Sequence, residues 1–483
     1  MDVPEIRAMV ALHLCQLTFY EEARKHLAVC ARVCKDWHST FKPFLYYYLS
    51  LRTYYPSSKR KTPAFPPVEE MQANSHLVQE LNLALFSTQS LTLQHTVATL
   101  RNLKKLGFRA MYLLNETAEI DWLSLRPLLV NNRGIQELSI ANITHPNCLV
   151  NVAEDCTSRL TTLRLSNMTF DWSQLLPVLT NCRQLRKLEC STCRFVGSLD
   201  QLMEVTATSR PVAINIAEVL LHQNSGVGKV SLVDWVRLCP RLETLMITKD
   251  RATRLGPDSQ FSPGPQLSNL QLDCRLLKDT ELTEVLTRCT SLTELTLERA
   301  SVSRHVFAAL SSHFGSLVSL DLSPLTTIEQ WMIKRIFEGC PRLEELYLLD
   351  VDVNSLYDSA LDDQEDLPWA CRDSLKNLWI MAMQMSLDGF VNNRFLKQLM
   401  NLKQLQRFTI KAIYRGNGAR CPLEFSEVPG DTPEAHLLSS MCKVKDCYGV
   451  SVKDPTWKLL REAWPRLLHF EYVLDDDDPY YSE

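Results

Sequence analysis

The stretch LTTLRL at residues 160–165 decides the fold, because the same arrangement of apolar residues recurs along most of the chain. Each copy is a hexad with apolar side chains at its first, fourth and sixth positions. Hexads start 25 residues apart at 135, 160 and 185, and again at 242, 267, 292 and 317. A fixed period of this length is typical of repeat architectures, in which each unit buries its apolar face against the next. The other six hexads are VQELNL (78–83), LKKLGF (103–108), LEELYL (343–348), LKNLWI (375–380), LQRFTI (405–410) and LLHFEY (467–472).

Between hexads the apolar spacing changes from two to about 3.6 residues, which predicts helices at 171–182, 280–289 and 327–340. Each unit is therefore predicted to be a short strand followed by a helix. The two longest steps between hexads, from 185 to 242 and from 405 to 467, each predict one degenerate unit, and VAINI at 212–216 fits the first. Four predicted helices end in a cysteine three residues before the next hexad, namely Cys182, Cys239, Cys289 and Cys340.

This pattern resembles the cysteine-containing class of leucine-rich repeats over residues 75–474. The resemblance implies an α/β fold, a right-handed leucine-rich-repeat solenoid with a curved parallel sheet inside and helices outside. Insertions are expected at 351–374, which contains Trp369, and at 412–450. Long insertions in repeat proteins often carry binding, so these two segments are expected to flank or cover the binding face.

Composition argues against several classes of function. The net charge of −4 provides no basic footprint for nucleic acid or an anionic membrane, and no apolar run approaches the roughly 18 residues of a membrane span. The sequence has no glycine-rich phosphate loop and no catalytic signature, so we expect neither an enzyme nor a cofactor. Cys190 and Cys193 have metal spacing, but no second ligand pair follows, so no metal is expected. The sixteen cysteines are expected to be reduced thiols in the cytoplasm, the nucleus or both.

Residues 1–51 do not follow the repeat and are predicted to form a small all-α module. Residues 3–14 (VPEIRAMVALHL) and 21–45 each predict a helical stretch. The V-P-E-I start, the later V-C-K-D-W at 33–37, and Phe44 with Leu45 resemble an F-box, although V-P-E stands where that family usually has L-P-x-E. An F-box implies docking on the Skp adaptor of a cullin-RING ubiquitin ligase. The adaptor-binding residues implied are Val3, Pro4, Ile6, Val10, Leu14, Val33, Trp37, Phe44 and Leu45. The alternative is that the module only caps the first repeat.

Two further segments complete the organisation. Residues 52–74 predict a connector, whose KRK at 59–61 is read as a solvated linker or as a nuclear signal. Residues 475–483 begin with the acidic run Asp475 to Asp478 and predict a solvated tail.

The substrate-binding surface is predicted from strand geometry. Side chains alternate between the two faces of a strand. Hexad positions three and five, and the residue directly after the hexad (position seven), should therefore face the concave surface. In the C-terminal half these positions predict an acidic strip beside exposed aromatics, suited to a basic partner with an apolar anchor. The alternative is a solvated strip with incidental aromatics. The residues are Asp273, Glu294, Glu298, Asp321, Glu345, Tyr347, Trp379 and Met381.

The sequence thus predicts the substrate-recognition subunit of a cullin-RING ligase of the SCF type, with the Skp adaptor, the cullin-RING subunits and a protein substrate as partners. The alternative is a free-standing leucine-rich-repeat scaffold or inhibitor with no ligase link.

Overall fold

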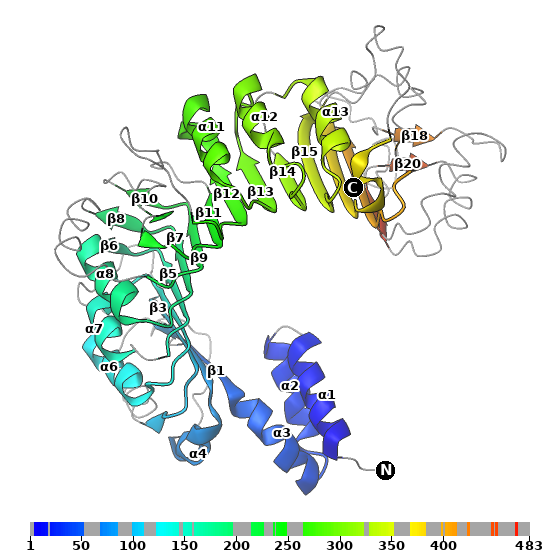
Figure 1. Ribbon diagram of the computed structural model, residues 1–483. Coiled ribbons are helices and arrows are strands. Elements are labelled where there is room, and N and C mark those ends of the chain that lie inside the picture. The colour runs from blue at the N-terminus through cyan, green and yellow to red at the C-terminus, as the bar shows by residue number, and fades with distance from the viewer. Residues whose placement is uncertain are drawn as a thin grey trace, which may run out of the picture. The chain divides into compact units, whose positions relative to one another are not determined.

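The computed structural model contains strands and helices that alternate along the chain (Figure 1). The chain divides into two compact units. The first comprises Met1–Val230 with Leu238–Arg241 and Asp250–Ala252, and the second comprises the remainder, including Thr253–Glu483. The structure describes residues 4–17, 20–52, 68–85, 99–110, 122–143, 148–156, 159–196, 214–226, 235–236, 238–248, 264–322, 328–351, 368–382, 398, 401–412, 423–425, 446–448, 450–452 and 469–471.

The first unit contains a sheet in which each strand is parallel to the next in sequence. Its pairing keeps the hexads in register, so that Leu106 of one strand is the partner of Leu138 in the next. The strands are β1 (Tyr48–Arg52), β2 (Glu80–Leu85), β3 (Lys105–Ala110), β4 (Glu137–Ala141), β5 (Thr162–Ser166), β7 (Lys187–Ser191) and β9 (Glu218–His222). A short parallel sheet also forms from β6 (Thr169–Asp171), β8 (Arg194–Val196) and β10 (Ser225–Gly226).

The second unit repeats this plan. In its main sheet each strand pairs in parallel with the next, again with the buried leucines side by side, as for Leu295 and Leu320. The strands are β11 (Thr244–Thr248), β12 (Asn269–Asp273), β13 (Glu294–Glu298), β14 (Ser319–Leu322), β15 (Glu345–Val351), β16 (Asn377–Ala382), β17 (Arg407–Ala412), β19 (Asp446–Tyr448) and β21 (His469–Glu471). Strands β18 (Leu423–Phe425) and β20 (Val450–Val452) form a separate parallel pair.

Helices cover one face of the main sheet in each unit (Figure 1), and the hexad leucines of that sheet are buried. In the second unit, Leu282 and Leu286 of one helix and Leu295 and Leu297 of the adjoining strand are all buried. The opposite face of each sheet carries hexad positions three and five, whose side chains stay at least partly exposed; we call it the open face. The helices are α6 (Trp122–Asn131), α7 (Cys148–Asp155) and α8 (Trp172–Asn181) in the first unit, and α11 (Asp279–Arg288), α12 (Arg304–Ser311) and α13 (Gln330–Gly339) in the second, with 3-10 turns η2 (Cys274–Leu276) and η4 (Ala370–Asp373).

The predicted α/β repeat is confirmed, since every one of the thirteen hexads carries a strand. A parallel sheet with helices on one face and this register is the architecture of a leucine-rich-repeat solenoid. One degenerate unit was misplaced by the sequence pattern. Its strand is Glu218–His222 rather than 212–216, because Ile216 occupies the first hexad position and Val219 and Leu221 the buried fourth and sixth. The other degenerate unit, between the hexads at 405 and 467, contains strand β19.

The N-terminal module is a bundle of three helices, α1 (Pro4–Leu17), α2 (Tyr20–Cys30) and α3 (Lys35–Tyr47). The helical stretch predicted at 21–45 is two helices, because the backbone turns at 31–34 and Cys34 is extended, with φ −160°. The module is also not wholly helical. Strand β1 follows α3 directly at Tyr48 and pairs with β2, so residues 48–51 belong to the repeat sheet.

The structure differs from the sequence-based expectation in two segments, the connector and the first insertion. The predicted connector at 52–74 contains helix α4 (Val68–Asn74), which leads into the turn η1 (Ser75–Leu77). Within the insertion at 351–374, Trp369 is buried and stacks on Phe337 of α13, with ring centroids 3.8 Å apart. This end of the insertion therefore packs into the core on the helical side of the sheet. The acidic tail lies outside the described residues.

In the part of the chain that the structure describes, no helix combines the length and the apolar character needed to cross a membrane.

Candidate protein-binding surfaces

The open face of the second unit brings together most of the residues predicted to bind substrate. Adjacent strands β13, β14 and β15 place Asp321 beside Tyr347 and Ser319 beside Glu345. Strand β16 continues both rows, because Tyr347 is the register partner of Trp379 and Glu345 that of Asn377. The predicted residues that share this face are Glu294, Glu298, Asp321, Glu345, Tyr347 and Trp379.

Tyr347 and Trp379 form a cross-strand aromatic pair at the centre of these rows. Their ring centroids are 6.2 Å apart and their planes are inclined by 51°, and both side chains are half-buried. Burial raises the pKa of the Tyr347 phenol, and the negative charges of Glu345 and Asp321 raise it further, whereas Arg407 lowers it. Two carboxylates and one guanidinium are therefore close enough to the Tyr347 ring to influence it.

Three carboxylates of this face accept hydrogen bonds from side-chain amides of neighbouring strands. Gln271 Nε2 donates to Glu298 Oε1 at 2.9 Å, and Asn377 Nδ2 donates to Glu345 Oε1 at 2.7 Å. Asn269 donates in the same way to Glu294. An amide satisfies a carboxylate oxygen without cancelling its charge, so these contacts fix the geometry and leave the negative charge in place.

Asp273 does not belong to this strip, and its prediction as a solvent-facing carboxylate is wrong. Its side chain is buried and accepts hydrogen bonds from Arg275 Nε at 3.0 Å and Arg275 Nη2 at 2.6 Å. Arg299 Nη1 lies 3.8 Å away, and the Arg275 backbone N–H also donates to this carboxylate as the cap of η2. Asp273 is the last strand residue, and its side chain is buried because it caps the turn η2 and is covered by Arg275 and Arg299. The side chain of Met381 lies outside the described residues.

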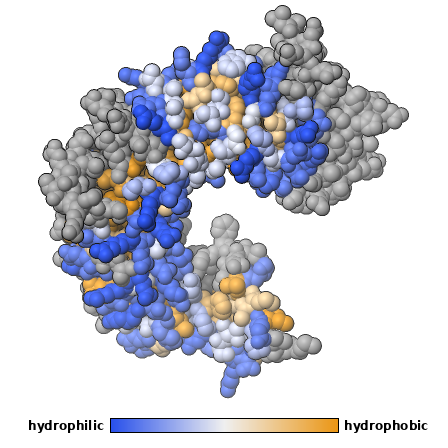
Figure 2. Space-filling view, viewed as in Figure 1, coloured by the Kyte–Doolittle hydropathy of each residue, from blue (hydrophilic) through white to orange (hydrophobic). Residues whose placement is uncertain are grey.

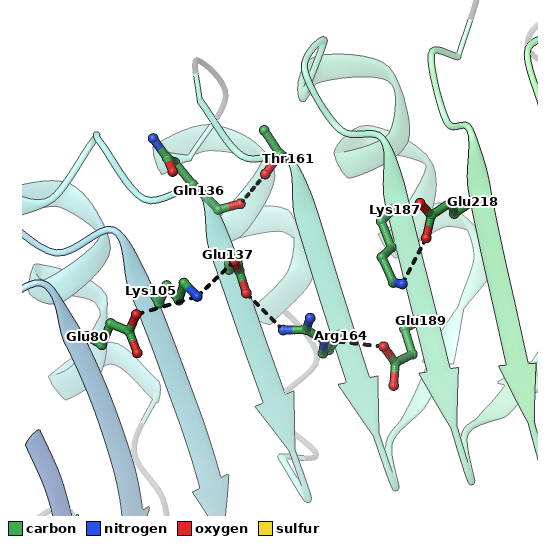
Figure 3. A network of polar contacts seen from close by, with 9 residues as sticks. All are labelled: Glu80, Lys105, Gln136, Glu137, Thr161, Arg164, Lys187, Glu189 and Glu218. Atoms are coloured by element: carbon green, nitrogen blue, oxygen red, sulfur yellow. Dashed lines mark hydrogen bonds and ion pairs between the residues drawn. The ribbon is translucent and has the colours of Figure 1, made fainter. Parts of the chain in front are cut away.

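The open face of the first unit has a different electrostatic character (Figure 3). Lys105 Nζ lies 3.4 Å from Glu80 and 3.2 Å from Glu137, on the strands either side of it. Arg164 continues the row, contacting Glu137 at 3.1 Å and Glu189 at 3.2 Å. A further ion pair between adjacent strands joins Lys187 Nζ to Glu218 at 2.8 Å. Acidic and basic residues thus alternate from strand to strand, and this face neutralises its own charge.

The N-terminal module presents a second candidate surface. Its small core consists of Ala11, Leu27, Ala31 and Phe41, and Trp37 stacks on Phe41 with ring centroids 5.2 Å apart. Outside this core the module exposes large hydrophobic side chains, and Figure 2 shows hydrophobic surface gathered on these helices. Among the described residues, seven of the ten exposed large hydrophobics lie here: Ile6, Met9, Val10, Leu12, Val29, Val33 and Tyr47.

The predicted adaptor-binding residues separate into two groups. Pro4, Ile6, Val10 and Val33 are exposed, as a docking role requires. Four others pack against the core of the module and hold it together, namely Leu14, Trp37, Phe44 and Leu45. Val3 lies outside the described residues.

The adaptor-binding set predicted from the sequence leaves out three exposed hydrophobic residues of α1 and α2, Met9, Leu12 and Val29. Met9 and Leu12 follow Ile6 at intervals of three residues, which places them on the face of α1 turned away from buried Ala11. This spacing is the signal that could have identified them. Val29, next to the buried Leu27, carries no comparable signal.

Three of the described cysteines that end repeat helices lie in apolar surroundings that suppress thiol reactivity. Burial raises the pKa of Cys182, Cys239 and Cys289 to about 12, so these thiols stay protonated at neutral pH. Cys190 and Cys193, whose spacing suggested a metal, are both fully buried, and the Cys193 thiol donates to the Leu165 carbonyl at 3.4 Å. Among the described residues there is no group of three His, Cys, Asp or Glu side chains that could hold a metal ion.

Comparison with known proteins adds little to these observations. No protein-family profile and no curated protein matches the sequence. Among solved structures, 138 chains match. One is described as "Crystal structure of TLR13-ssRNA13 complex", with 14% identity and a TM-score of 0.43, covering 82% of this chain and 49% of that one. This chain thus spans about half the length of the TLR13 chain. The assignment of the fold rests on the hexads and their strands, and architectures of this kind typically serve as binding scaffolds rather than enzymes.

Proposed function

We propose that this protein is the substrate-recognition subunit of a cullin-RING ubiquitin ligase of the SCF type. In this proposal the three-helix module docks on the Skp adaptor, and the repeats bind a protein substrate. Ubiquitin transfer is then performed by the partners that the chain recruits.

The observation that carries the proposal is the exposed hydrophobic surface of the module. Ile6 is 51% exposed, Val33 is 63% exposed and Met9 is 63% exposed, although the module belongs to a chain whose repeats bury their leucines almost completely. Large apolar side chains gathered on a small module favour a surface that a protein partner covers. The F-box resemblance of the same segment is the reason for proposing the adaptor as that partner.

Charge-introducing variants test this docking. Ile6→Asp and Val33→Asp should each weaken binding to a purified Skp adaptor by about tenfold or more, because an ionised carboxylate resists burial in an apolar interface. Both side chains are more than half exposed, so the variants should fold normally. Isothermal titration calorimetry with the full chain measures the affinity, and circular dichroism checks the fold.

Val130→Asp is the matched control. Val130 is 42% exposed on α6, outside the module, so the same change there should leave adaptor affinity unchanged. If the wild-type chain does not bind the adaptor at micromolar concentration, the ligase assignment is wrong, and the repeats act as a free-standing protein-binding scaffold.

A further inference from the structure

Glu137 and Glu345, at the third hexad position on the open faces of the two units, have partners of different charge. In the first unit, Glu137 contacts both Lys105 and Arg164, so cations of neighbouring strands neutralise it. In the second unit, Glu345 receives a hydrogen bond from Asn377, a side chain that carries no charge. Electrostatic attraction for a charged partner is therefore concentrated on the open face of the second unit.

No lysine or arginine occupies the third or fifth hexad position of β12 to β16, the strands that form the centre of this face. The nearest cation along these rows is Arg407 on β17, which is exposed and is the register partner of Asn377. Arg407 therefore marks one border of the acidic region. Asp273, neutralised by Arg275, marks the other.

The aromatic pair supplies a platform inside this acidic region. Asp321 is the register partner of Tyr347 on the preceding strand, and Glu345 precedes Tyr347 by two residues on the same strand face. A cation stacked on Trp379 or Tyr347 would therefore have carboxylates within reach on two sides. Aromatic faces attract cations, and flanking carboxylates add charge-assisted hydrogen bonds.

We infer that the open face of β13 to β16 binds an extended, arginine-bearing segment of a partner protein, with the guanidinium stacked on the Tyr347 and Trp379 pair between Asp321 and Glu345. This inference specifies the substrate class and so rests on the proposed substrate-binding role of the repeats. Arginine fits better than lysine because its planar guanidinium both stacks on rings and pairs with a carboxylate through two hydrogen bonds. A phosphate-bearing partner would be repelled by the same carboxylates.

A labelled peptide of alternating glycine and arginine tests the inference directly. Fluorescence anisotropy with the full-length chain, in the absence of any adaptor, should show saturable binding. Affinity should decrease as salt rises above about 0.15 M, because the carboxylates are partly exposed. The matching glycine–lysine peptide should bind more weakly, and the glycine–glutamate peptide should not bind.

Two variants and two controls locate the site. Trp379→Ala should weaken binding of the arginine peptide by about 30-fold, the loss typical of a hot-spot aromatic. The double change Asp321→Asn with Glu345→Gln keeps side-chain size, should weaken binding by about three- to tenfold, and should flatten the salt dependence. Trp331→Ala is the control for the first variant, since Trp331 is 42% exposed on α13, on the helical side of the sheet. Glu338→Gln, also on α13, is the control for the second.

Equal binding of the glutamate peptide would overturn the inference. The inference would also be overturned if both site variants bound the arginine peptide with unchanged affinity, or if the two control variants lost as much affinity as the site variants. If Trp379→Ala fails to fold, the carboxylate variant decides the question by itself. Because the assay contains no adaptor, a negative result leaves the docking of the module untouched, and a positive result stands even if the ligase assignment fails.

Discussion

Asn132 should be one of the most costly polar residues to remove from the first unit. Its side chain is buried just beyond helix α6 and makes three hydrogen bonds to main-chain atoms of two repeats. Its Oδ1 accepts from the Leu103 N–H at 2.9 Å, and its Nδ2 donates to the carbonyls of Leu100 at 3.0 Å and Leu128 at 2.8 Å. The residues Leu100, Leu103 and Leu128 are themselves buried. The amide therefore ties a helix end to the segment that precedes β3.

The magnitude follows from these contacts. Three hydrogen bonds at about 0.5–1.5 kcal/mol each already amount to a few kcal/mol, and leaving the Leu103 N–H buried without a partner adds about 1–3 kcal/mol. We expect Asn132→Ala to lower the free energy of unfolding of the first unit by about 3–5 kcal/mol. Asn132→Asp should be at least as harmful, because it loses both donated bonds and buries a charge against two carbonyls.

Urea unfolding followed by circular dichroism at neutral pH measures this change. The matched control is Asn102→Ala, because Asn102 is exposed and its Nδ2 donates one hydrogen bond, to the His76 carbonyl at 3.0 Å. Its loss should cost no more than about 1 kcal/mol. The reasoning is refuted if Asn132→Ala costs no more than Asn102→Ala, since water or a rearranged backbone would then satisfy the exposed partners.

Two further predictions concern the buried hexad leucines and the ion pairs on the open face of the first unit. Leu295→Ala removes a buried hexad side chain of β13 and should cost roughly 2–5 kcal/mol in urea unfolding, whereas Thr296→Ala on the open face should change stability little. An unchanged midpoint for Leu295→Ala would contradict its place in the core. For Glu137, burial opposes ionisation, but hydrogen bonds from Lys105 and Arg164 outweigh it and hold the pKa of this carboxyl below its ordinary value. Its stabilising contribution is therefore present at neutral pH and lost as pH falls through the folded-state pKa, so the stability difference between wild type and Glu137→Gln should shrink below about pH 4. A difference that grows on acidification would show that the ion pairs do not stabilise the fold.

Much of the fold could be predicted because the spacing of apolar residues along the sequence specifies each repeat. A hexad such as LTELTL at 292–297 specifies both a strand and the face that it buries, since side chains alternate along any strand. The helices that follow are specified by a change of period, and Cys289 marks the point where one of them ends. The strands that lack a clear hexad were the ones misplaced or missed, as with Glu218–His222 and Tyr48–Arg52.

The candidate sites were predicted less completely, because exposure and charge pairing depend on contacts between residues far apart in the chain. On the N-terminal helices the sequence identified an apolar set, but only packing separated Trp37, which stacks on the core, from Val33, which is exposed. Trp369 was expected in an insertion near the binding face, and stacking on Phe337 buries it on the other side of the sheet.

What the sequence by itself determined is the periodic part of this protein: the strands, the helices and the open-face residues Glu294, Tyr347 and Trp379. What only the tertiary structure decided is which charges survive on that face. The carboxylate of Asp273 is neutralised by Arg275, two residues further along the chain, whereas that of Glu345 accepts hydrogen bonds from the uncharged side chains of Asn377 and Ser319 on the neighbouring strands. The physical reason is that a side chain's charge is fixed by its own chemistry, but its neutralisation depends on the neighbours that stacking of the repeats places beside it.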